Sequence, residues 1–146
     1  MIAEDTSLDK ARDYEVAARL AGEFFIRGVE ILARAHDGDL VKGIIFTAIA
    51  VANSESAPVA ANEPERRPVS VMSISSSIGV PYETTRRYVN LLVDQGLCVR
   101  MGRRGVIVTD AAFVRPGMVA AYQDTHISFN RLVSALRRAQ YAGLKP

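Results

Sequence analysis

Side chains suited to base and phosphate recognition are concentrated in one short stretch of this sequence. They are Tyr82, Glu83, Thr84, Arg86, Arg87, Asn90, Arg103 and Arg104. Arginine pairs with a guanine edge and asparagine with an adenine edge, each through two hydrogen bonds, whereas hydroxyl groups suit phosphate oxygens. We therefore expect Arg86 and Asn90 to read bases in duplex DNA, and Arg103 and Arg104 to contact the backbone. Glu83 fits equally well as a cytosine acceptor or as an acid favoured by the helix dipole.

The distribution of charge points to the same stretch. Residues 1–65 carry 12 acidic and six basic side chains, whereas residues 66–105 carry seven arginines against two acids, in a chain with a net charge of +2. A segregated basic segment is typical of a phosphate-facing surface. The alternatives are a solvated face without a partner and, for Arg87, an ion pair with Asp94.

The elements expected around these side chains are a helix, a turn, a second helix and a hairpin. The pattern predicts a helix over 71–77 capped by Ser70, a turn at Gly79-Val80-Pro81, a helix over 82–95 ending before Gly96, and strands over 97–101 and 106–109. In the second helix, Thr85, Val89 and Leu92 share one face, which we expect to be buried. Arg86 and Asn90 then point outward.

Long helices are expected on both sides of this region. Apolar periodicity predicts helices over 8–35, with N-cap candidates at Asp5, Thr6 and Ser7, over 40–53, nearly apolar all round, and over 117–141. Residues 54–68, rich in proline and polar residues, predict a loop. The fold class is thus mostly α with a small β wing, in three segments (1–65, 66–110 and 111–146) of one integrated domain. The apolar stripes of the terminal helices predict a homodimer.

The central region resembles winged helix-turn-helix domains of bacterial transcription regulators, the MarR-like and IclR-like families. The resemblance rests on Ile74-Ser75, Ile78-Gly79-Val80-Pro81, Thr84-Thr85-Arg86-Arg87, Val89, Leu92 and Gly96-Leu97, within residues 66–110. It implies a recognition helix over 82–90 and a wing tipped by Arg103 and Arg104. The terminal helices are similar to those that pair two subunits in the MarR arrangement. The wing tip is shorter than usual there, and Pro81 stands where serine commonly caps the recognition helix.

Other function classes have less support in the sequence. There is no phosphate-binding glycine loop, zinc-ligand spacing or nucleophile elbow, so we expect no enzyme, no cofactor and no metal site. A single cysteine, Cys98, and the absence of an apolar run of about 20 residues favour a cytoplasmic protein without a membrane span. The main alternative is a winged-helix module that binds proteins instead of double-stranded DNA. A small-molecule effector is compatible with either function.

Overall fold

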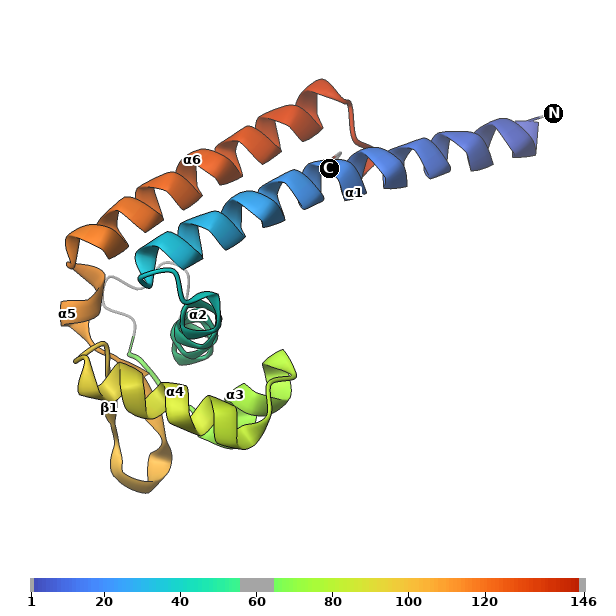
Figure 1. The fold of residues 1–146 in the computed structure, drawn as a ribbon. Helices are drawn as coiled ribbons and strands as arrows, with labels where there is room; N and C mark the ends of the chain where they lie inside the picture. The colour runs from blue at the N-terminus through green and yellow to red at the C-terminus, as the bar shows by residue number, and fades with distance from the viewer. Residues whose placement is uncertain (1, 56–64, 145–146) are drawn as a thin grey trace. The chain divides into compact units, whose positions relative to one another are not determined.

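The computed structural model describes residues 2–55 and 65–144, with side chains from residue 7 onward. Its elements are α1 (Ile2–Ala35), α2 (Leu40–Ser54), α3 (Val71–Ile78), α4 (Tyr82–Asp94), β1 (Cys98–Arg100), β2 (Val106–Val108), α5 (Asp110–Phe113) and α6 (Pro116–Arg138), with 3₁₀ turns at Gly102–Arg104 and Ala142–Leu144 (Figure 1). The predicted class, mostly helical with one small two-stranded sheet, is confirmed. Most of the predicted loop over 54–68 lies outside the described residues.

The contacts divide the chain into two compact units. One unit consists of residues 1–31 and 120–146, and the other of residues 32–119. The helix α2 belongs to the second unit, together with α3, α4 and the hairpin. The three-segment organisation inferred from the sequence stays a prediction.

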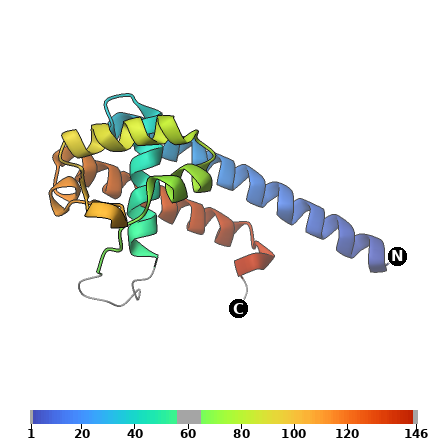
Figure 2. The same cartoon turned by 90° about the horizontal axis from the view of Figure 1, so that it is seen from below.

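The first unit is built from α1 and α6, which run antiparallel and side by side (Figures 1 and 2). Phe24 and Phe129 meet edge to face with their ring centroids 6.3 Å apart, and Leu20 is buried nearby. The helix α1 begins at Ile2, so the prediction that residues 5–7 cap it was wrong. Several large apolar side chains of this unit remain exposed: Leu8, Tyr14, Phe25, Ile26, Tyr122, Ile127 and Phe129.

The second unit has its core around α2. The buried side chains are Ile45, Phe46 and Ile49 of α2, Ile74 of α3, Val89 and Leu92 of α4, Leu97 and Cys98, Val106 and Val108 of β2, Ala112 and Met118. The expected apolar character of α2 is explained by its contacts with α3, α4 and β2. One stripe stays open, because Val51 is 56% exposed and Ile44 is 37% exposed.

The hairpin is short and closely attached to the segment before α3. Its strands pair antiparallel with Val99 opposite Ile107, and a single bridge joins Val69 to Val106. Both strands are shorter than predicted, because Met101 leads into the 3₁₀ turn at Gly102–Arg104 and Thr109 is the N-cap of α5. Asn53 of α2 is hydrogen-bonded to β2 of the hairpin. Its side-chain amide donates to Val106 O (3.1 Å), and its oxygen accepts from Val108 N (2.9 Å).

Beyond the hairpin, a short helix that was not predicted precedes the expected last helix. Thr109 caps the short helix α5 by accepting a hydrogen bond from Ala112 N (3.2 Å), and α6 begins at Pro116 and ends at Arg138. The prediction of one helix over 117–141 was therefore correct at its beginning and three residues too long at its end. Gln140, with a φ of 53°, follows in the left-handed region that ends helices.

Candidate nucleic-acid interface

Local hydrogen bonds explain how α3 and α4 are joined. The Ser70 side chain caps α3 by accepting from Ser73 N (3.1 Å), and Gly79 ends it with a φ of 68°. The Ser75 hydroxyl donates to Val80 O (2.7 Å), so this small side chain holds the turn as well as permitting close packing. Pro81 lies at the N-cap position of α4, directly before its first residue Tyr82, and forms no side-chain capping bond.

The two faces of α4 differ as the spacing predicted. Thr85, Val89 and Leu92 are fully buried against the core. The opposite face lines a shallow groove of about 510 Å³. Its lining residues are Glu83, Thr84, Arg86, Arg87, Asn90, Leu91 and Asp94. Five of the eight residues singled out from the sequence are thus brought together on one surface, and Tyr82 is 41% exposed at the beginning of the same helix.

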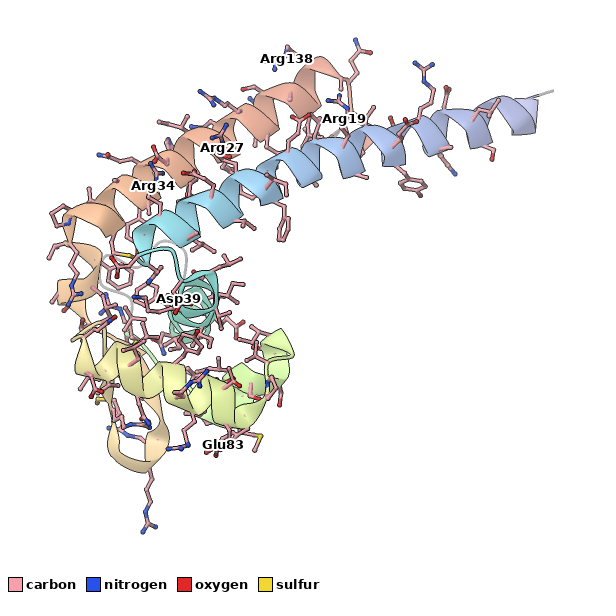
Figure 3. All side chains as sticks on the ribbon, in the orientation of Figure 1. Arg19, Arg27, Arg34, Asp39, Glu83 and Arg138 are labelled. Carbon is pink, nitrogen blue, oxygen red and sulfur yellow. The ribbon has the colours of Figure 1, made fainter. Side chains whose placement is uncertain are left out.

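Arg86 is engaged by Glu83 one turn before it. The Arg86 Nε and Nη2 atoms lie 3.1 and 3.0 Å from Glu83 Oε2 (Figure 3 labels Glu83 on the outer side of α4). The hydrogen bond and the charge of Glu83 raise the pKa of Arg86, so the guanidinium stays charged. Since both side chains are on the surface, the pair orients Arg86 without removing it from solvent.

Asn90 is tied to the hairpin by a residue that was not among the expected site residues. The Nη2 atom of Arg100, on β1, donates to Asn90 Oδ1 (2.5 Å). This bond occupies one lone pair of Asn90 Oδ1 and leaves its second lone pair and the amide N–H groups for another partner. The sequence signal for Arg100 was its place in the basic hairpin, but its pairing with α4 depends on tertiary structure.

Three arginines around this surface form neither an ion pair nor a side-chain hydrogen bond within the part of the chain that the structure describes: Arg87, Arg103 and Arg104. The guanidinium of Arg87 lies 5.6 Å from the centre of the Tyr88 ring. The alternative pairing of Arg87 with Asp94 is therefore absent. Arg103 and Arg104 are exposed in the hairpin tip, where Gly102 and Gly105 both have positive φ.

Arg66, by contrast, serves the fold. Its Nη1 atom lies 2.6 Å from Asp110 Oδ1 and 3.1 Å from Val108 O, and its guanidinium stacks over Phe113. The charge count over residues 66–105 thus overstates the positive charge available to a ligand, because one arginine is half-buried and paired across the hairpin.

Other kinds of chemistry find no constellation among residues 7–55 and 65–144. Burial raises the pKa of the Cys98 thiol to about 12, so this side chain is an unreactive apolar one in the folded protein. No three His, Cys, Asp or Glu side chains of the described residues are grouped as metal ligands. Within the same ranges, no helix has the length and apolarity needed to cross a membrane.

Comparisons with protein-family models, with curated proteins and with solved structures find no match for this chain.

Proposed function

We propose that this protein binds double-stranded DNA as a transcriptional regulator, with α4 in the major groove and the hairpin tip on the backbone. The observation that carries the proposal is the exposure of Arg87, Arg103 and Arg104 without an acidic partner in residues 7–55 and 65–144, on the same unit as Arg86 and Asn90. Uncompensated arginines next to an exposed polar helix face have the composition of a DNA-binding surface. The role is one of binding and requires no catalytic group.

The contacts suggest different roles for the two base-reading candidates. Asn90 is held by Arg100, so its amide is already oriented and suits an adenine edge. Arg86 is held by Glu83 and suits a guanine edge, with Glu83 in a position to accept from a neighbouring cytosine. Tyr82 and Thr84, near the helix N-terminus, are suited to phosphate oxygens.

The first experiment tests the backbone contacts of the hairpin tip. Binding of duplexes selected from a random pool would be measured by fluorescence anisotropy over a range of salt concentrations. Each phosphate contact adds about 0.9 to the slope of log affinity against log salt, so Arg103→Ala/Arg104→Ala should flatten the slope by about 1.8 and weaken binding to all sequences. The control, Arg137→Ala/Arg138→Ala at the end of α6, removes the same charge elsewhere. An unchanged slope in the first variant refutes the tip contact.

The second experiment tests base reading by α4. Arg86→Ala and Asn90→Ala should each relax the selected sequence at one or two positions, since a bidentate base contact contributes about 1–3 kcal/mol of discrimination. Arg19→Ala, which removes an exposed arginine that is also paired with a glutamate on its own helix, is the matched control for Arg86. A selected motif that stays the same in both variants would show that other residues read the bases.

We propose further that the protein is a two-fold homodimer through its first unit. Leu8 and Tyr14 of α1 are 67% and 70% exposed, and Phe25 and Ile26 are each 67% exposed. Exposed apolar side chains at this density favour a protein partner, and two-fold pairing is the commonest closed symmetry. A dimer predicts a near-palindromic site with half-sites about 10 bp apart. Light scattering that gives the 15.9 kDa monomer mass, with and without DNA, would refute the dimer.

One observation favours a protein partner instead of DNA for the second unit. Tyr82, Leu91 and Val99, on α4 and β1, are each about 40% exposed, so the surface is not purely polar. A protein-binding module would show no salt-dependent affinity for any duplex in the pool. The salt titration described above therefore separates the two functions.

A further inference from the structure

A lysine is buried in the second unit, away from the α4 surface. The Lys42 side chain, on α2, is only 6% exposed, yet within the described part of the chain its ammonium group has one ion pair, 3.1 Å from Asp37 Oδ2. The Asp37 side chain is 89% exposed, so only the lysine of this ion pair is buried. A buried ammonium group is costly unless its donors are satisfied, and it has three of them. Lys42 thus has the capacity to bind a further acceptor.

His36, next to this lysine, is also unsatisfied. It is 1% exposed, and its Nε2 atom has no hydrogen-bond partner among the residues that the structure describes. The ring packs on Phe46, with centroids 5.2 Å apart, and its Cδ2 atom lies close to Gly43. Burial, and then the charge of Lys42, lower the pKa of His36. The ring is therefore neutral at pH 7 and donates from Nε2 in one of its two tautomers.

A pocket of about 410 Å³ lies beside these two residues and is lined by further donors. Its lining residues are Ala35, His36, Asp37, Lys42, Gln95, Leu97, Arg115, Gly117 and Met118. Arg115 is exposed and donates through Nη2 to Gln95 O. Gly117 is the second residue of α6. Pro116 before it has no N–H, and the Met118 and Val119 N–H groups donate to Arg115 O, so within the described residues the Gly117 N–H is the donor that this turn leaves for an anion, which the helix dipole also favours.

The chemistry of the lining is that of an anion site. Lys42 and Arg115 outnumber the single acid, Asp37, and the first turn of α6 adds a partial positive charge. Ala35, Leu97 and Met118 supply apolar walls. The volume lies within the range of sites for small molecules.

We propose that this pocket binds a small molecule through an oxyanion group, a carboxylate or a phosphate. The Lys42 ammonium group and the first turn of α6 hold the charge, Arg115 contributes at the rim, and His36 Nε2 donates from the closed side. The proposal goes beyond DNA binding and does not depend on it, since the pocket and the outer face of α4 share no residue.

The test uses the full-length protein without DNA. Inorganic phosphate and acetate are titrated at millimolar concentrations and constant ionic strength, with chloride as the reference anion, and binding is followed by calorimetry and by NMR. We expect saturable shifts of the Gly117 amide and of the His36 ring protons with at least one oxyanion and not with chloride. The two oxyanions separate a phosphate from a carboxylate ligand. An absence of shifts with both oxyanions, or equal shifts with chloride, overturns the proposal.

Variants locate the site. Lys42→Met should weaken oxyanion binding about tenfold or more, because a hydrogen bond to a charged group contributes about 1.5–3 kcal/mol. Lys10→Met, which removes an exposed lysine from the first unit, is the matched control and should leave affinity unchanged. If Lys42→Met does not fold, the oxyanion affinity of Arg115→Gln tests the proposal, with Arg12→Gln as its control. Wild-type affinity in the deciding variant overturns the proposal.

Discussion

Asn53 should be among the most sensitive positions in the second unit. Its side chain is 1% exposed and makes three hydrogen bonds: its amide donates to Arg67 O (2.7 Å) and to Val106 O (3.1 Å), and its oxygen accepts from Val108 N (2.9 Å). These bonds connect α2 with the segment before α3 and with β2. The prediction is that Asn53→Ala destabilises the unit without changing the exposed surface of α4.

The magnitude follows from which partners are left unsatisfied. Val106 O keeps the hydrogen bond from Val69 N, and the partly exposed Arg67 can recruit water, so each loss costs about 0.5–1 kcal/mol. The buried Val108 N–H is left without its acceptor, which costs about 1–3 kcal/mol. We expect a loss of about 2–5 kcal/mol in the free energy of unfolding.

Urea unfolding followed by circular dichroism measures the total loss, and amide hydrogen exchange at Val108 measures the local one. Protection of the Val108 amide should fall together with global stability. Asn130→Ala, at an exposed position on α6, is the control and should change stability by less than about 0.5 kcal/mol. If the free energy of unfolding of Asn53→Ala stays within about 0.5 kcal/mol of the wild-type value, as expected for an exposed position, this assignment of the hydrogen bonds is refuted.

Three further predictions concern the hairpin, pH and the cysteine. Gly105→Ala should lower the free energy of unfolding by more than about 2 kcal/mol, because a Cβ there would lie 2.2 Å from Val69 O at a φ of 122°. Gly102→Ala, in open space at a φ of 58°, should lower it by only about 1–2 kcal/mol, and equal losses in thermal unfolding would contradict this. Since the folded pKa of His36 lies below 6.5, the unfolded chain binds more protons in acid, so stability should be retained above about pH 6.5 and fall as the pH drops through the folded pKa. His36→Gln should flatten this dependence in urea titrations at several pH values, and an unchanged profile would contradict it. Cys98, with a pKa of about 12, should react with a thiol reagent at pH 8 only at the rate of unfolding, so rapid labelling of folded protein would show that the thiol is accessible.

The local elements could be predicted from the sequence because interactions between residues close in the chain determine them. The cap at Ser70, the left-handed turn at Gly79 and the end of α4 before Gly96 depend on neighbours a few residues away. The burial of Thr85 and the exposure of Arg86 follow from the helical period alone. The grouping of the α4 site residues on one face was therefore predictable.

Pairings between distant segments were decided only by the tertiary structure. The pattern around Arg66 does not reveal that it pairs with Asp110, 44 residues later, instead of joining the basic surface. Nor does it reveal that Arg100 holds Asn90, or that Asn53 fastens α2 to a hairpin more than 50 residues away. Such contacts depend on which elements pack together, and helical or strand periodicity carries no information about that choice.

The same reason explains the pocket beside Lys42. In the sequence, Lys42 is a lone charge in an apolar helix and His36 belongs to a turn. Their burial, and the approach of Arg115 and Gly117 from more than 70 residues away, arise only when α6 begins next to α2. The sequence by itself determined which residues carry charge and which helix faces are apolar, whereas the fold decided which charges lost their water and which gained partners, because desolvation is a property of the packed structure.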